Sequence, residues 1–214
     1  MKTRPRGLRE RQKLGRERRI VRAAARLFVR PGYAVTSMED IAVKAKLAVG
    51  TIYNYFPSKP DLLLAIARRE TEELVARGHE IAASASGDPV VAIIAVADIL
   101  LDGFMTDDRW LWRELLAAAI ADPRRIGQRM FELDVRIVAL LAELVENFKS
   151  RGAIGSEIEA MRAATVIYGI ALTWINAWML NDDMTPATAR EEIHRGIEIA
   201  CNGIVGRIAR KRQP

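Results

Sequence analysis

Apolar residues recur every three or four positions along most of this chain, which is the spacing of one face of an α-helix. The pattern predicts a first helix over residues 16–29, followed by two short helices over residues 36–45 and 49–56. A longer helix is expected from Ser58 to about Ala83. Because no strand-like alternation and no internal repeat is visible, the predicted fold class is all-α.

The rest of the chain keeps the helical period in five further segments. A loop of small and polar residues at 84–89 separates them from the preceding helix. Ser156 and Glu159 have the spacing of a capping box, and Pro186 suits the first position of a helix. The expected helices are 90–105, 110–121, 123–150, from Ser156 to about Leu180, and from Pro186 to about Ala209.

The two short helices near the N-terminus form the most informative segment. Thr36 and Glu39 have capping-box spacing, so the first short helix is expected to begin there. Ala48 precedes the second helix, where its missing cap side chain costs about 1 kcal/mol. The outward residues of that second helix are small, polar or aromatic, and such a face can enter a major groove. They are Val49, Gly50, Thr51, Tyr53, Asn54 and Tyr55. Two short helices joined by a tight turn predict a helix-turn-helix unit.

Charge is distributed unevenly along the chain. Residues 1–60 contain 15 Lys and Arg against 4 Asp and Glu, whereas residues 61–214 contain 18 against 23. A basic head on a mildly acidic body is typical of a nucleic-acid-binding protein. Residues 1–15 are expected to form a flexible basic arm whose arginines track phosphates or a minor groove. The alternative for this arm is a solvated basic tail.

The stretch GYAVTSMEDIAVKAKLAVGTIYNYFPSKPDLL resembles the DNA-binding signature of the tetracycline-repressor (TetR) family of bacterial regulators. Its elements coincide with that signature in order: Gly32-Tyr33, Thr36-Ser37, Ile41-Ala42, Gly50-Thr51-Ile52-Tyr53, Tyr55-Phe56 and Lys59. The resemblance covers about residues 19–64. Two positions depart from the pattern. Lys46 stands where the family usually has glycine, and Ala48 stands where it usually has serine or threonine.

The resemblance implies a ligand-responsive transcriptional regulator that is a homodimer, namely a repressor released from a palindromic DNA operator by a small-molecule inducer. An activator would share the same residues. Residues 16–64 would be the DNA-binding domain, and residues 65–214 the helical domain for ligand binding and dimerisation. Thr36, Ser37, Tyr55 and Lys59 would hold phosphates. Val49, Gly50, Thr51, Tyr53 and Asn54 would face the bases.

The last two predicted helices carry more apolar and small residues than one chain would cover. Pairing with a second copy in a four-helix contact would bury them, as the resemblance also implies. A pocket for the inducer would be mostly apolar with a few polar groups. The alternative for each aromatic residue is a place in the core or in the dimer interface. The candidate pocket residues are Phe104, Trp110, Arg113, Glu114, Phe131, Tyr168, Trp174 and Asn176.

Residues 163–181 contain no charged side chain and approach the length needed to span a bilayer. Three polar residues dilute this stretch, its flanks lack a basic cluster, and no second candidate of similar length exists. We therefore expect a buried helix and no membrane partner. The alternative function is a helical module that binds another protein or an anionic membrane surface through its basic head.

The sequence offers little for catalysis. His79 and His194 each lack a second ligand at metal-binding spacing, and no nucleophile elbow or phosphate loop appears. We therefore expect no enzyme activity, metal or cofactor. The single cysteine, Cys201, excludes an internal disulfide, suits the cytoplasm and is expected to be a small buried residue.

Overall fold

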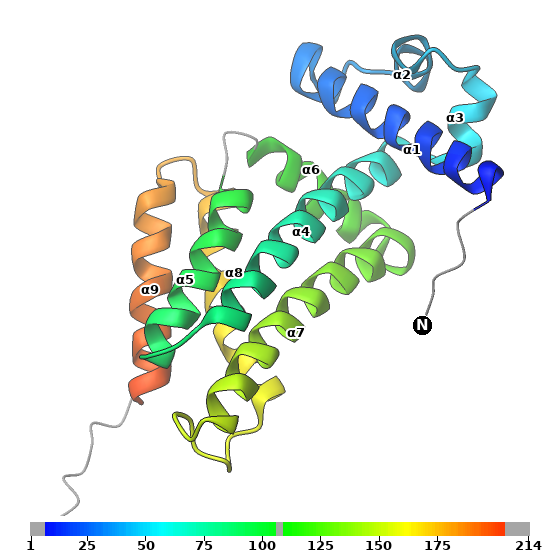
Figure 1. The fold of residues 1–214 in the computed structure, drawn as a ribbon. Helices are drawn as coiled ribbons and strands as arrows, with labels where there is room; N and C mark the ends of the chain where they lie inside the picture. The colour runs from blue at the N-terminus through cyan, green and yellow to red at the C-terminus, as the bar shows by residue number, and fades with distance from the viewer. Residues whose placement is uncertain (1–6, 106–108, 204–214) are drawn as a thin grey trace, which may run out of the picture. The chain divides into compact units, whose positions relative to one another are not determined.

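The computed structural model describes residues 7–105 and 109–203. Within these ranges the chain forms helices and no strand, as the hydrophobic period predicted (Figure 1). The elements are α1 (Leu8–Leu27), η1 (Phe28–Gly32), α2 (Met38–Ala45), α3 (Val49–Tyr55), α4 (Lys59–Ser84), α5 (Pro89–Phe104), α6 (Arg109–Ala121), η2 (Pro123–Gly127), α7 (Gln128–Ser150), α8 (Ala160–Leu180) and α9 (Pro186–Asn202). The element η2 is a single π-helical turn, whereas η1 is interrupted at Arg30, which has the extended dihedrals φ −146° and ψ 121°.

The chain divides into two compact units. The first consists of Met1–Arg69 with Glu114–Arg129, and the second of Glu70–Arg113 with Met130–Pro214. The first unit is built around α1, α2 and α3, whose inward residues were predicted from the period. Its fully buried side chains include Ile20, Ala24, Phe28, Ile41 and Ile52.

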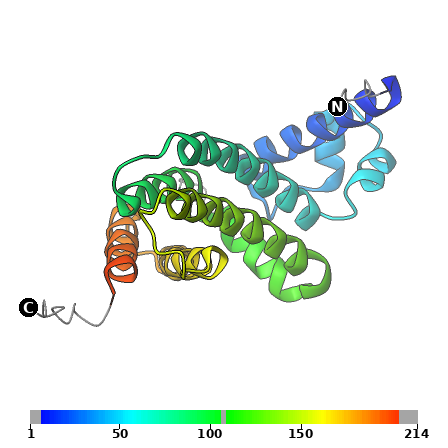
Figure 2. The ribbon, with the colours of Figure 1, turned by 60° about the horizontal axis from the view of Figure 1, so that its bottom comes forward.

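The second unit is a helical bundle in which α9 packs against both α8 and α5 (Figures 1 and 2). Its core is formed by aliphatic side chains of α5 and α7 and by Trp178 of α8, which is 1% exposed. Cys201 lies near the end of α9 and is exposed, which corrects the expectation that it is buried. The last residues of α9, 200–202, are exposed, so none of the described residues covers this end of the helix.

Helix α1 begins at Leu8, eight residues before the expected start at Arg16. Residues 8–15 of the expected arm are therefore helical, and residues 1–6 lie outside the described part. The hydrophobic period missed these eight residues, about two turns of helix, because most of them are charged or polar. Most of them nevertheless have good intrinsic helix propensity.

Two predicted helix starts and one end differ from the structure. Ser37, one residue after Thr36, caps α2 and forms the capping box with Asp40. Helix α8 begins at Ala160, four residues after the predicted start at Ser156, because turns occupy residues 151–158. The predicted capping box of Ser156 and Glu159 does not form, since the start of α8 has no side-chain cap. Helix α9 ends at Asn202, since Gly203 adopts φ 86°, a conformation that interrupts the helix. The expected extension to Ala209 lies outside the described residues.

Candidate nucleic-acid interface and ligand cavity

The turn between α2 and α3 is held by its backbone. Lys46 ends α2 in the left-handed conformation, with φ 53° and ψ 50°, and the amide of Leu47 donates to the carbonyl of Ala42 at 3.0 Å. A side chain in this conformation costs about 1 kcal/mol or more, which a glycine avoids. Ala48 supplies no cap for α3, as the sequence predicted.

Helix α3 presents the outward face that the sequence predicted. Ile52 is 0% exposed and anchors the helix, while Gly50, Tyr53 and Asn54 are exposed. A Cβ atom at Gly50 would meet no atom within 4 Å, so the backbone of α3 is open to close approach there. The partly exposed residues Val49, Thr51 and Tyr55 complete this face.

Thr36 does not belong to that exposed surface. It is 2% exposed, and its hydroxyl donates to the carbonyl oxygens of Gly32 at 2.7 Å and Leu27 at 3.1 Å. Because the hydroxyl is buried and already bonded, the structure argues against the predicted phosphate contact. Ser37 is partly exposed, but its hydroxyl is bonded to Asp40 at 2.6 Å, which holds the pKa of that carboxyl below its usual range.

Lys59 joins the start of α4 to the turn that precedes α2. Its Nζ donates to the carbonyl of Tyr33 at 2.8 Å and to that of Ala34 at 3.3 Å, and it lies 4.6 Å from the centre of the Tyr33 ring. The Tyr33 ring in turn packs edge-on against Phe28. Burial, together with the charge of Glu114, raises the pKa of Tyr33 to about 12. The Nζ atom of Lys59 is thus already bonded to two carbonyls. The predicted contact of Lys59 with a phosphate stays a prediction.

A buried carboxylate lies at the start of α4. Asp61 is 4% exposed and accepts a hydrogen bond from the hydroxyl of Ser58 at 2.5 Å. Arg125 of η2 donates to the same carboxylate at 2.5 Å, and Arg129 of α7 lies 3.5 Å from it. The sequence did not reveal the two arginines, because 64 residues separate Asp61 from Arg125.

The outer side of α1 is strongly basic. Exposed arginine and lysine side chains repeat along it and leave the apolar side, with Ile20 and Ala24, facing the core. This basic surface lies in the same compact unit as α3. It consists of Arg11, Lys13, Arg16, Arg18, Arg19, Arg22 and Arg26.

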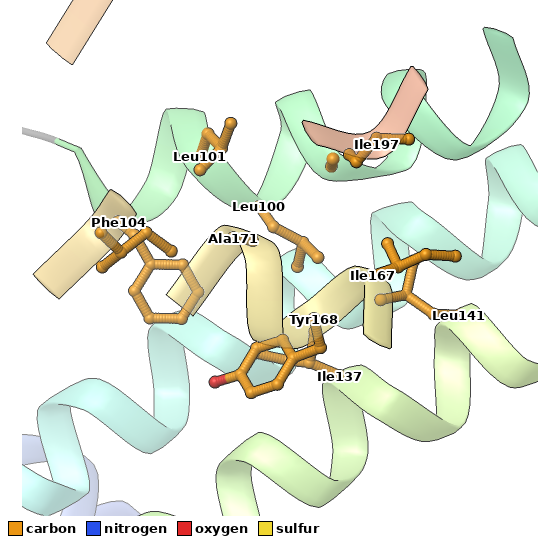
Figure 3. Close-up of a pocket in the computed structure, with 11 residues that line it drawn as sticks. Leu100, Leu101, Phe104, Ile137, Leu141, Ile167, Tyr168, Ala171 and Ile197 are labelled. Carbon is orange, nitrogen blue, oxygen red and sulfur yellow. The ribbon is translucent and has the colours of Figure 1, made fainter. Parts of the chain in front are cut away.

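The second unit contains a small apolar cavity between α5, α7, α8 and α9 (Figure 3). Its volume is about 20 Å³, enough for roughly one water molecule. Two of the eight predicted ligand residues, Phe104 and Tyr168, line it. The other six do not: Trp110, Arg113, Glu114, Phe131, Trp174 and Asn176.

The side chain of Tyr168 extends from the cavity wall to a half-buried acid. Its hydroxyl donates to Asp134 of α7 at 2.6 Å. Burial raises the pKa of Asp134, and the hydrogen bond from Tyr168 partly opposes that rise. Burial and the neighbouring carboxylate also raise the pKa of Tyr168, so its hydroxyl remains a donor at neutral pH.

Two arginines of α6 bind the end of α8. Arg109 donates to the carbonyls of Asn181 and Met184 and stacks on the ring of Trp178 at 4.6 Å. Arg113 donates to the carbonyl of Met179 and to the carboxylate of Asp182, which it approaches to 2.6 Å. Arg113, aided by Arg109, lowers the pKa of Asp182.

Helix α8 leaves apolar side chains in water. Val166 is 56% exposed and Leu180 is 67% exposed. By length and composition, α8 is long and apolar enough to cross a membrane, a test that interior helices of other proteins also pass. Among the described residues, no group of three His, Cys, Asp or Glu is arranged to hold a metal ion.

The segment that contains α2 and α3 is similar to proteins already known. A family profile described as bacterial regulatory proteins of the tetR family matches residues 20–66, which contain the C-terminal part of α1, all of η1, α2 and α3, and the start of α4. This segment of the chain is similar to the tetR family. The repressor KstR of Rhodococcus jostii is 43% identical over 63 residues, which are 29% of this chain and 30% of KstR. The match thus spans less than a third of that relative.

Two further comparisons extend over most of the chain. The fatty acid metabolism regulator protein of Bacillus subtilis is 26% identical over 180 residues, covering 80% of this chain and 87% of that protein. The crystal structure of Thermus thermophilus FadR, a TetR-family repressor in complex with lauroyl-CoA, has a TM-score of 0.76 at 22% identity. It covers 93% of this chain and 100% of FadR. At this identity the FadR comparison establishes the fold.

Proposed function

We propose that this protein is a ligand-responsive transcriptional regulator that binds a DNA operator through α3 and is released by a small-molecule inducer. The observation that carries the proposal is the exposed face of α3, which has no charged side chain and an open backbone at Gly50. Such a helix fits a major groove and reads base edges with hydroxyl and amide groups. The basic outer side of α1, in the same unit, would contact phosphates.

Thr51, Tyr53 and Asn54 would contact bases together with Val49 and Gly50, while Ser37, Tyr55 and Lys59 would lie nearest to phosphates. Thr36 is left out of this set because it is buried. The proposed action takes place in the cytoplasm, where the DNA is accessible.

The proposed regulator acts as a homodimer through α8 and α9. Exposed apolar side chains on these two helices, including Val166, Leu180 and Ile199, support this assignment. A second copy would cover them in a contact that is the same on both subunits. Two copies of α3 would then read two half-sites about one turn of DNA apart.

The test is a footprint on the DNA that flanks the coding region of this protein. We expect protection of two half-sites related by a two-fold axis, with an affinity that falls as salt rises. Sedimentation of the same preparation should give a dimer. Absence of salt-sensitive binding to duplex DNA, together with flotation on anionic liposomes, would instead support a membrane-surface module.

A further inference from the structure

The ridge of α3 that points away from the core consists of Gly50 and Asn54. Residues four positions apart share one side of a helix, and both of these lie opposite Ile52, which is 0% exposed. Gly50 and Asn54 are themselves exposed. A helix that enters a major groove with its buried side toward its own protein therefore brings this ridge closest to the bases.

Gly50 leaves open the space in front of Asn54. A helical side chain leans toward the N-terminus of its helix, so the side chain of Asn54 is directed over the turn that contains Gly50. A Cβ atom at Gly50 would meet no atom within 4 Å, so the packing of this unit does not require glycine there. Close approach of the backbone to another molecule is a common reason for glycine at such a position.

The side-chain amide of Asn54 has no partner among the described residues. By contrast, the hydroxyls of Thr36 and Ser37 and the ammonium group of Lys59, in the same unit, are bonded to other atoms of the chain. The carbonyl oxygen and the NH2 group of Asn54 are therefore free to accept and to donate hydrogen bonds to a molecule that approaches α3.

The outward surface of α3 carries no charge. Helix α3 contains neither lysine nor arginine, and the basic residues nearest to it in the sequence are Lys46 and Lys59. The ammonium group of Lys59 is bonded to two backbone carbonyls, while Lys46 is exposed in the turn before α3. Guanine presents two acceptors, N7 and O6, in the major groove, and arginine and lysine are the side chains that usually bind them. Helix α3 itself thus lacks a usual partner for guanine.

The amide of Asn54 matches adenine. Its NH2 group donates to N7 of adenine while its carbonyl oxygen accepts from the N6 amino group, so that both halves of the amide are bonded. Opposite guanine, the same carbonyl oxygen would face the acceptor O6 and remain without a donor. A polar group that loses its water without gaining a partner is costly, so the amide distinguishes the two purines.

Methyl groups flank the amide. Val49 and Thr51 lie on the two sides of the ridge, are partly exposed, and each carry a methyl group. Thymine is the base that presents a methyl group in the major groove, and apolar contacts with that group favour A·T pairs. The three side chains thus match the same kind of base pair.

We propose that Asn54 binds an adenine in each operator half-site and that Val49 and Thr51 contact thymine methyl groups beside it, so that α3 recognises A·T pairs. The inference rests on the proposed function and specifies which bases the same helix selects. Gly50 allows the close approach, and the basic side of α1 contributes affinity that does not depend on sequence. Lys46 is the rival, since an exposed ammonium group before α3 would select guanine.

The first experiment uses the full chain and a pool of randomised DNA duplexes. Sequences that bind are selected, and single adenines of the selected duplex are then replaced by 7-deazaadenine, which pairs normally but lacks the N7 acceptor. We expect one adenine in each half-site at which the analogue lowers affinity about twofold to tenfold, the factor that corresponds to one hydrogen bond. Uracil in place of the neighbouring thymine should lower affinity by about fourfold or less, the factor for one buried apolar carbon.

Asn54→Ala tests whether this side chain binds the adenine. In the variant, 7-deazaadenine should lower affinity no further, because the donor to N7 is already absent. Asn202→Ala is the matched control, since Asn202 is an exposed asparagine at the end of α9 in the other unit, and there the analogue should keep its full effect. An effect of the analogue that persists in Asn54→Ala would overturn the proposal.

Gly50→Ala tests the close approach separately from folding. The added methyl group meets no atom of the protein within 4 Å, so the midpoint of thermal unfolding should stay the same or rise. Affinity for the selected duplex should fall at least about fivefold, because the helix is held away from the bases. Unchanged affinity would show that α3 does not come close to the bases and would contradict the proposal.

The selection also separates the base assignment from the function on which it rests. If no duplex binds in a salt-sensitive manner, the regulator and the base assignment are both refuted. If duplexes bind but the bases they require are guanines, the regulator stands and the adenine assignment is overturned. A guanine preference that disappears in Lys46→Ala would overturn it in favour of Lys46.

Discussion

The guanidinium of Arg125 donates to the carboxylate of Asp61 at 2.5 Å, joining η2 to the first turn of α4. Asp61 is buried and also accepts from Ser58, whereas Arg125 is partly exposed. Burying a carboxylate is tolerated because it is paired and hydrogen-bonded. The contact fixes the start of the helix that follows α3.

Removing this carboxylate should destabilise the fold. Asp61→Asn is expected to lower the free energy of unfolding by about 2 kcal/mol, since charged hydrogen bonds contribute about 1.5–3 kcal/mol. In the background of Arg125→Ala the same change should cost less, because the two residues share one interaction. Urea unfolding of the four proteins measures this coupling. Additive losses would show that the pair makes no joint contribution.

The left-handed conformation of Lys46 suggests a substitution that should stabilise the fold. Lys46→Gly should raise the free energy of unfolding by about 0.5–1 kcal/mol, because relief of the left-handed conformation exceeds the added freedom of the unfolded chain. Lys46→Ala is the control. It removes the same charge and keeps the Cβ atom, so it should give no gain. Thermal unfolding of both variants decides whether the backbone or the charge is responsible.

Thr36 and Thr51 should respond differently to loss of the hydroxyl. Thr36→Val removes the hydroxyl that donates to the carbonyls of Leu27 and Gly32, of which Gly32 keeps the backbone amide of Thr36 as a donor. The variant is expected to cost about 1–2 kcal/mol of stability without changing base preference. Thr51→Val should leave stability within about 0.5 kcal/mol and relax base preference at one position of each half-site. Gel-shift titrations on a set of operator variants, paired with urea unfolding, test both. Changed base preference in Thr36→Val would restore it to the DNA-contact set.

Asp134 should make stability depend on pH in the mildly acidic range. Its pKa is raised by burial, so the native state binds more protons than the unfolded state between the ordinary carboxyl pKa and the raised native one. The free energy of unfolding contributed by this group is therefore highest below that window and falls as pH rises through it. Asp134→Asn should remove this slope. Unfolding measured from about pH 3 to about pH 7 would reveal a difference between variant and parent.

Tyr168→Phe provides the complementary change. Loss of the hydroxyl removes the hydrogen bond that partly opposes the rise in the pKa of Asp134, so the pH window should widen. At neutral pH the variant should be less stable by about 1–3 kcal/mol, because the buried carboxylate loses a donor. An unchanged pH profile would show that Tyr168 does not influence the acid.

The sequence predicted the elements whose signal is local. Ile41 and Ile52 follow the helical period and face inward, and Ser58 with Asp61 has the spacing of a cap. Leu8 to Gly15 escaped prediction because a mostly polar stretch has no period, although it is helical. The burial of Thr36 could not be predicted, because its partner Leu27 lies on an earlier helix. Contacts such as Arg125 with Asp61, or Phe104 with Trp112, depend on how distant segments meet, which no local spacing encodes.

The apolar side chains that α8 exposes to water have a further implication. A chain that covers Val166 and Leu180 with a second copy becomes more stable as its concentration rises, because mass action favours the pair. In dilute solution the pairs separate, and the population of paired chains then grows with the square of the chain concentration. The dimer proposed above would therefore set a threshold in copy number, below which the controlled genes would escape the protein.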